Sequence, residues 1–267
     1  MQKEQNQNLN VQQREKIDDK SQTSTSHFKS RNDEGLYDFM ILNMNKLEPA
    51  KLMLREKTQQ LFPEDAVMLT APDQCELMRT MIKLGKCKYG LEVGCFTGYS
   101  ALCMAQGIQE GGMIHTIDIT DKYSQLAKEH WKFAGLQDKI TLHVNDGLSQ
   151  LKDFLKQQQK NQLYKFDFAY VDANKLEYQQ YFEVLAFLIK DGGFIMFDNI
   201  LWKGRVKDEA SRDNDPKAKA AYETARMVLN DERFDTNTFM IGDGLMIATK
   251  KSLVSQKSQN QMQNETK

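Results

Sequence analysis

Oxygen-bearing side chains follow two hydrophobic runs in the second half of the sequence, where they could bind a cation. Asp172 follows the run at residues 166–171, and Asp198 and Asn199 follow the run at residues 194–197. Carboxylate and amide oxygens are the ligands that hard cations such as Mg²⁺, Mn²⁺ or Ca²⁺ prefer, in contrast to the thiolates and imidazoles of zinc sites. The same residues could instead cap turns after buried strands, as Asp and Asn often do. The pattern alone leaves both readings open.

A second group of residues, after an earlier hydrophobic run, has the pattern of a nucleoside-binding turn. Glu92 precedes two glycines four residues apart, Gly94 and Gly98. Cys95 stands near the place where a dinucleotide-binding G-x-G-x-x-G turn needs a further glycine to approach pyrophosphate, which favours a cofactor without phosphates. Asp118 ends the next run, 24 residues beyond Gly94, where an acidic side chain can bind a ribose diol. Alone, Asp118 could equally be a turn carboxylate.

The elements that must position these residues alternate between two periodicities. Strands are expected at residues 89–93, 113–117, 140–144, 166–171 and 194–197. Amphipathic helices are expected at residues 36–47 and 49–61, from residue 72, and at residues 100–108, 123–134, 148–155, 178–189 and 218–229. Residues 236–241 and 245–249 read as an antiparallel hairpin. We therefore predict an α/β, Rossmann-like fold with a mostly parallel sheet, a C-terminal hairpin, helices on both faces and ligands at the carboxyl ends of the strands.

Charge and cysteine content narrow the class of protein. Lys and Arg total 36 against 37 Asp and Glu, a net charge of −1, so the chain lacks the basic footprint of a nucleic-acid or acidic-membrane binder. The four cysteines form no C-x-x-C pair and the four histidines form no zinc motif. No stretch resembles a signal peptide or a membrane span. We expect a cytoplasmic protein that acts on small molecules.

The two ends of the sequence differ in composition from its middle. Residues 1–32 and 251–267 are rich in Gln, Asn and Ser and poor in apolar residues, and they account for the low mean hydropathy of −0.63. Such segments bury too little apolar surface to offset chain entropy, so both are predicted to be disordered tails around a domain at residues 33–250. Residues 156–162 have the same bias and are expected to form a surface loop.

Four motifs resemble those of the cation-dependent O-methyltransferases of the caffeoyl-CoA type, which are relatives of catechol O-methyltransferase. The motifs are Leu91–Ala101, Tyr170–Lys175, Gly192–Trp202 and Gly242–Gly244, and the similarity runs in order from Met68 to Lys250. The resemblance implies a class I methyltransferase fold with S-adenosylmethionine as methyl donor. By the same resemblance, the donor contacts Met68, Thr70, Glu92, Gly94, Cys95, Ser100, Asp118, Gly147 and Asp172.

The resemblance also gives roles to the cation-binding pattern. It implies that Asp172, Asp198 and Asn199 hold the cation, most simply Mg²⁺, and that Lys175 is the general base, with Asp172 close to the sulfonium. The chemistry is consistent, because a cation chelated by two adjacent catechol oxygens lowers the pKa of a hydroxyl. Lys175 could then accept the departing proton. The plainer alternative is an exposed lysine at the start of a helix.

The chain departs from the family pattern around the acceptor. Asn174 stands where plant members commonly have an aspartate, and Lys203 stands where an asparagine or similar residue follows the tryptophan. Trp202 could be an aromatic wall for a planar acceptor or a packed core residue. No CoA-binding lysine motif can be aligned, so we predict a catechol-like small molecule as acceptor and, by resemblance, a homodimer.

Two other classes of function remain open at this stage. The chain could be a catalytically silent member of the family that serves as an assembly subunit through its polar tails. It could also be a nicotinamide oxidoreductase on a similar sheet, although the missing G-x-G-x-x-G and the Asp198-Asn199 pair argue against that.

Overall fold

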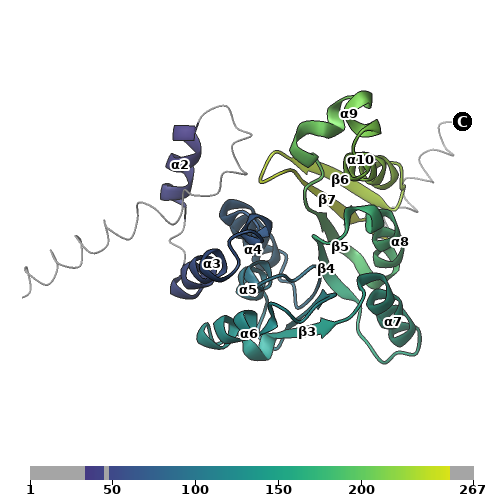
Figure 1. Cartoon of the computed structure of the whole chain (residues 1–267). Helices are drawn as coiled ribbons and strands as arrows, with labels where there is room; N and C mark the ends of the chain where they lie inside the picture. Colours follow the sequence, from purple (N-terminus) through teal and green to yellow (C-terminus); the bar gives the residue numbers. More distant parts are fainter. Residues whose placement is uncertain (1–33, 45–47, 253–267) are drawn as a thin grey trace, which may run out of the picture.

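A seven-stranded sheet forms the centre of the molecule in the computed structural model, which describes residues 34–44 and 48–252 (Figure 1). The strands are β1 (Tyr89–Val93), β2 (Met113–Asp118), β3 (Ile140–Val144), β4 (Phe166–Val171), β5 (Ile189–Phe197), β6 (Phe234–Phe239) and β7 (Leu245–Lys250). Their order is β3-β2-β1-β4-β5-β7-β6, parallel except where β7 pairs with β5 and β6. The predicted fold class is confirmed.

Helices cover both faces of the sheet and give it two cores. Helices α3 (Pro49–Leu61), α4 (Pro72–Leu84), α5 (Tyr99–Ala105) and α6 (Ser124–Phe133) pack on one face. Helices α7 (Gly147–Gln159), α8 (Tyr178–Leu188) and α10 (Pro216–Leu229) pack on the other (Figure 1). The remaining helices are α2 (Glu34–Asn43) and α9 (Glu209–Asp213), and single 3₁₀ segments lie at Ala66–Met68, Gln137–Lys139, Lys175–Glu177 and Trp202–Lys207. Among the described helices, none has the length and apolar character that crossing a membrane requires.

The central strand β4 shows why these residues form a sheet buried on both sides. Its side chains alternate, so that Phe168 and Tyr170 enter the core beneath α4 and α5 while Ala169 and Val171 enter the core beneath α8. All six residues of β4 are buried. Apart from the buried Asp167, the strand consists of apolar and aromatic residues, as expected for a strand of a parallel sheet. Its end at Val171 places the next residue, Asp172, at the carboxyl edge of the sheet.

The structure corrects several predicted boundaries. The Gln-rich segment that was predicted as a loop from residue 156 continues helix α7 to Gln159, because glutamine and lysine are good helix formers. Helix α2 ends at Asn43 instead of residue 47, and residues 45–47 are not among those described. Strand β6 begins at Phe234, two residues before its predicted start. The predicted N-terminal tail, and the C-terminal one beyond residue 252, lie outside the described residues.

Candidate active site

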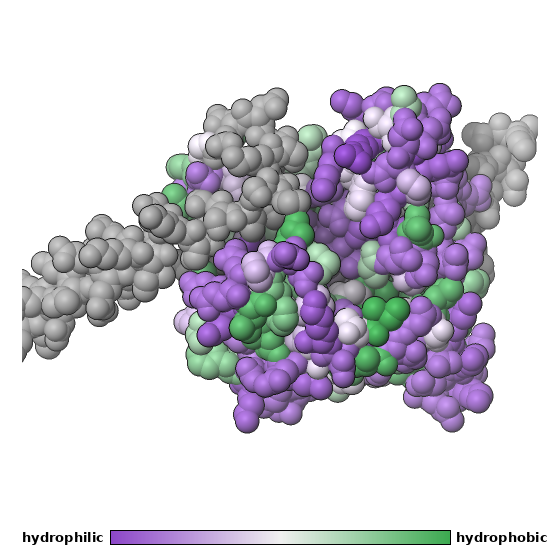
Figure 2. Space-filling model, in the orientation of Figure 1, coloured by the Kyte–Doolittle hydropathy of each residue, from purple (hydrophilic) through white to green (hydrophobic). Residues whose placement is uncertain are grey.

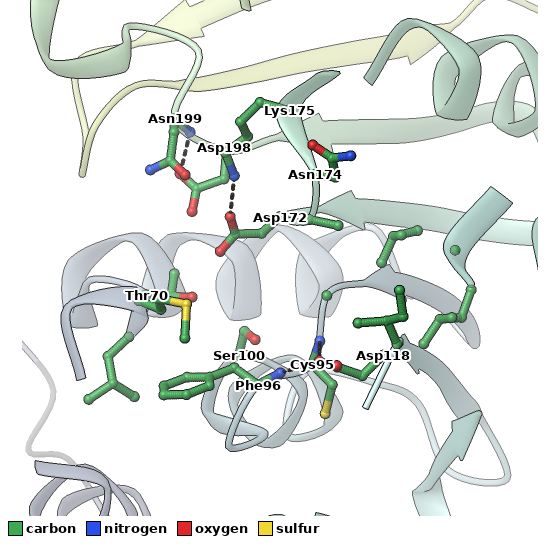
Figure 3. A pocket seen from close by; sticks show the side chains of 18 of the residues that line it. Thr70, Cys95, Phe96, Ser100, Asp118, Asp172, Asn174, Lys175, Asp198 and Asn199 are labelled. Atoms are coloured by element: carbon green, nitrogen blue, oxygen red, sulfur yellow. Dashed lines mark hydrogen bonds and ion pairs between the residues drawn. The ribbon is translucent and has the colours of Figure 1, made fainter. Parts of the chain in front are cut away.

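A cavity of about 520 Å³ opens at the carboxyl ends of the parallel strands (Figure 3). It lies where strands β1, β2, β4 and β5 end, and the residues that follow each of them line it. In the order of this sheet, β1 lies next to β4 although β2 and β3 come between them in the sequence. Open α/β sheets bind ligands at such a switch in strand order.

The structure brings nearly all of the predicted site residues to this cavity. The predicted residues that line it are Met68, Thr70, Gly94, Cys95, Ser100, Asp118, Gly147, Asp172, Asn174, Lys175, Asp198, Asn199, Trp202 and Lys203. Glu92 is the exception, since it does not line the cavity.

The turn after β1 packs closely against the backbone that follows β4. Gly94 has φ 99°, and a Cβ atom there would collide with the carbonyl oxygen of Asp172. Gly98 has φ 80° and lies against the Trp131 indole, whose Nε1 donates to the Gly98 carbonyl at 3.0 Å. Both positions therefore require glycine. The spacing of the two glycines reflects packing of the turn against neighbouring elements.

Asp118 holds the same turn from the side of β2. Its Oδ2 accepts the backbone N–H groups of Cys95, at 3.0 Å, and Phe96, at 2.8 Å, and its Oδ1 accepts that of Thr120 at 3.1 Å. Phe96 has φ 50°, a conformation that a bulky residue rarely adopts. The carboxylate thus fixes a strained loop, which is the role of a turn carboxylate that the sequence left open for Asp118. Asp118 also lines the cavity.

Glu92 lies behind the turn and is fully buried. Its two carboxyl oxygens accept hydrogen bonds of 2.5 Å from the hydroxyls of Ser100 and Thr116. Burial raises the pKa of the Glu92 carboxyl to about 8, although the hydrogen bonds from Ser100 and Thr116 lower it; the charges of Asp172 and Asp118 make smaller contributions that raise it. This geometry gives no support to the predicted direct contact between Glu92 and a cofactor. Glu92 orients Ser100, which does line the cavity.

The predicted cation ligands form a cluster on the β4 and β5 side of the cavity (Figure 3). Asp198 is only 4% exposed; its Oδ2 accepts the Tyr170 hydroxyl at 2.7 Å and its Oδ1 accepts the Asn199 backbone N–H at 2.6 Å. Burial and, after it, the Asp172 carboxylate raise the pKa of Asp198. Two carboxylates that repel one another in a buried place would be stabilised by a shared cation.

The donor atoms of the cluster fit a hard divalent cation. Asp172, Asp198 and Asn199 contribute only oxygens, which suits Mg²⁺, Mn²⁺ or Ca²⁺. Within the described residues no group of three His, Cys, Asp or Glu side chains could hold a metal. A cation here therefore depends on the amide of Asn199 as third protein ligand. Asn199 has φ 53°, a conformation that asparagine tolerates better than most residues and that often marks functional sites.

Lys175 is buried next to these carboxylates, at 7% exposure. Its Nζ donates to Oδ1 of Asp172 at 2.7 Å (Figure 3). The same Nζ lies 5.0 Å from the centre of the Tyr178 ring. The alternative of an exposed helix-start lysine is therefore wrong. Lys175 lines the cavity within reach of a ligand bound at the cluster.

The far end of the cavity is formed by the segment after β5. Trp202 is partly exposed and lines the cavity, with its Nε1 donating to Oδ2 of Asp215 at 2.8 Å. Trp202 is therefore part of the cavity wall and not a residue packed in the core. Lys203 also lines this end, where its backbone N–H donates to Oδ1 of Asp243 at 2.7 Å.

Several lining residues were missed by the sequence analysis. They include Gln74, Phe96, Tyr99, Ile119, Tyr123, Glu177, Tyr181, Lys217 and Asp243. Ile119 had a usable signal, because an apolar residue directly after a strand-ending aspartate has no place in the buried sheet. Lys217 had none, since it begins a helix 18 residues beyond Asn199.

Comparison with known proteins places this site in a family. A family model described as O-methyltransferase matches residues 44–251. A caffeoyl-CoA O-methyltransferase of Populus kitakamiensis is 33% identical over 199 residues, which cover 73% of this chain and 83% of that protein. The tapetum-specific methyltransferase 1 of Arabidopsis thaliana is 35% identical over 203 residues, with the same coverage of both chains.

Solved structures agree on the fold. The O-methyltransferase from Bacillus cereus in complex with SAH has a TM-score of 0.70 at 23% identity, over 81% of this chain and 97% of that one. TomG from Streptomyces achromogenes in complex with SAM has a TM-score of 0.72 at 20% identity, over 80% and 95% of the two chains. The matched family model spans both the turn after β1 and the carboxylate cluster. The chain belongs to the O-methyltransferase family.

Proposed function

We propose that this protein is an S-adenosylmethionine-dependent, divalent-cation-dependent O-methyltransferase of vicinal dihydroxy aromatic compounds. The observation that carries the proposal is the cluster of Asp172, Asp198 and Asn199 with buried Lys175, on the wall of the same cavity as the turn after β1. Such a cavity can hold a methyl donor and an acceptor side by side, so that catalysis consists largely of alignment.

The donor half of the cavity suits a nucleoside that carries no phosphate. Asp118 and Asp146 line it, and their negative charge disfavours phosphate. Gly147 lines it as well, and a Cβ atom there would stand 3.0 Å from Cγ1 of Val93 and 3.1 Å from the Tyr181 hydroxyl. We assign donor binding to Met68, Thr70, Gly94, Cys95, Ser100, Asp118, Gly147 and Asp172, with Glu92 acting through Ser100. S-adenosylmethionine supplies an activated methyl group on a sulfonium.

At the acceptor half, Asp172, Asp198 and Asn199 would hold the cation, which would favour the phenolate form of a chelating catechol. Tyr170 fixes the orientation of Asp198 through its 2.7 Å hydrogen bond. In its neutral form, Lys175, whose Nζ lies 2.7 Å from Oδ1 of Asp172, would take the proton that a bound hydroxyl loses. We assign Asn174, Trp202 and Lys203 to contacts with the acceptor.

Methyl transfer from a labelled donor to a panel of catechols, with and without a chelator, tests this function. We expect transfer that is lost in chelator and restored by Mg²⁺ or Mn²⁺. Asp198→Ala should abolish turnover while donor binding stays measurable by calorimetry, and the exposed Asp213→Ala is a control of equal charge change. Full activity in chelator would overturn the cation dependence. Donor binding without transfer to any acceptor would favour a silent assembly subunit, an alternative that the O-methyltransferase relatives do not favour.

The remaining predictions concern the whole chain. We propose a cytoplasmic homodimer with disordered polar tails at residues 1–32 and 251–267 around the domain at residues 33–250. Light scattering of the full chain measures the assembly state, and limited proteolysis locates the tails, which should be cut first.

A further inference from the structure

Positive charge gathers on the part of the cavity wall that is formed by residues after β5. Three lysines line the cavity, and Lys175 is engaged with Asp172. Of the other two, Lys203 lies in the 3₁₀ segment after β5 and Lys217 in the first turn of α10. The loops after β2 and β3 contribute Asp118 and Asp146 to the lining and no cation. Asp243 also lines the cavity, where it accepts the Lys203 backbone N–H, so the two lysines leave this side with a net positive charge while the side at Asp118 and Asp146 is negative.

The ammonium groups of Lys203 and Lys217 are available to a ligand. In the described ranges neither of them forms an ion pair with a carboxylate. Asp215, two residues before Lys217, is already engaged, because its Oδ2 accepts from Arg205 at 2.7 Å and from Trp202 at 2.8 Å. Both lysines are exposed. Lys217 belongs to α10, and Figure 2 shows a predominantly hydrophilic surface over α9 and α10.

The backbone holds the two lysines around the aromatic wall. The Nζ of Lys217 lies 5.6 Å from the centre of the Trp202 ring. Trp202 and Lys203 have φ 42° and 55°, and Gly204 follows with φ 75°. Two consecutive non-glycine residues in this conformation are strained, and hydrogen bonds from Trp202 to Asp215 and from the Lys203 N–H to Asp243 hold them there. The strained turn therefore fixes the backbone position from which the Lys203 side chain extends.

We propose that the preferred acceptor is a catechol with a carboxylate-bearing side chain, which Lys203 and Lys217 bind while its ring lies along Trp202. This inference rests on the proposed O-methylation and deepens it by naming the charge of the substrate. A ring whose hydroxyls reach the Asp172 and Asp198 cluster extends its opposite side chain toward the segment after β5. A carboxylate there meets two ammonium groups. A protonated amine meets repulsion.

A charge series on one carbon skeleton tests the inference by binding. The compounds are 3,4-dihydroxyphenylacetate, 4-ethylcatechol and 3,4-dihydroxyphenethylamine, titrated with Mg²⁺ present and no donor. Quenching of Trp202 fluorescence reports binding, because the second tryptophan, Trp131, is buried behind the turn after β1. Trp202→Phe should abolish the signal. We expect the acid to bind about tenfold more tightly than the neutral compound and the amine most weakly, since an exposed charge pair contributes about two- to fivefold.

Charge-removing variants locate the effect. Lys203→Gln and Lys217→Gln should each reduce the ratio of acid to neutral affinity by about two- to fivefold, and the double variant should remove the preference. Lys219→Gln is the matched control, because Lys219 is an exposed lysine of the same helix that does not line the cavity. Equal binding of the three compounds, or a preference that survives in the double variant, overturns the inference. Selective binding of the acid without methylation of any compound would instead overturn the proposed function alone.

Discussion

Replacing Glu92 by glutamine should change how the stability of the protein depends on pH. The Glu92 carboxyl is fully buried between the hydroxyls of Ser100 and Thr116, and burial raises its pKa from 4.5 to about 8. The folded protein therefore keeps a proton on Glu92 over a range of pH in which the unfolded chain has lost it. Because the folded state binds more protons there, the free energy of unfolding falls as pH rises from 4.5 to 8.

The size of the effect follows from the width of that window. At about 1.36 kcal/mol per pH unit, 3.5 pH units correspond to about 5 kcal/mol between pH 4 and pH 9, as an upper bound. Glutamine has nearly the same shape and does not titrate, so Glu92→Gln lacks this loss. We expect the variant to gain stability relative to the original protein as pH rises, by up to this amount.

Urea denaturation followed by circular dichroism at pH 5, 7 and 9, without donor or metal, measures the difference. Other groups titrate in both proteins, so the comparison isolates Glu92. Parallel stability profiles for the two proteins would refute the assignment of a protonated, buried carboxyl. A large loss of donor affinity in Glu92→Gln with unchanged stability would instead support direct contact with the donor and contradict the positioning role through Ser100.

Three further predictions concern other parts of the fold. Tyr170→Phe removes the donor to Oδ2 of Asp198 but keeps the buried ring, so Mn²⁺ affinity measured by calorimetry should fall about ten- to a hundredfold, and unchanged affinity would contradict this role. Gly94→Ala forces a Cβ atom against the Asp172 carbonyl at φ 99°, so thermal unfolding should show a loss of at least about 2 kcal/mol together with lost donor binding. Burial and His143 lower the pKa of His115 to about 4. The unfolded chain therefore binds more protons between pH 6.5 and 4, and acidification should destabilise the protein less in His115→Phe, as denaturant midpoints at pH 7 and 5 would show.

Local sequence was sufficient for the central strands. The bounds of β1, β3 and β4 agree with the predicted ones, because each short run is preceded by a lysine and followed by Gly, Asn or Asp, which mark the ends of strands. The Gln-rich stretch after Leu155 was misread, since its composition was taken for a loop although its residues favour a helix. The polar composition of this stretch indicates only that it faces solvent, whereas the helix propensity of its residues decides the local conformation.

The sequence also determined which chemistry the cavity could contain, because residues that follow parallel strands meet at one edge of the sheet whatever the loops do. That is why Asp118, Asp172 and Asp198 line one cavity. Only the tertiary structure decided which groups face it. Glu92 sits behind the turn because it pairs with hydroxyls from α5 and β2. Lys217 reaches the cavity because α10 packs against the segment after β5. Such contacts depend on long-range packing, which no local pattern of residues encodes.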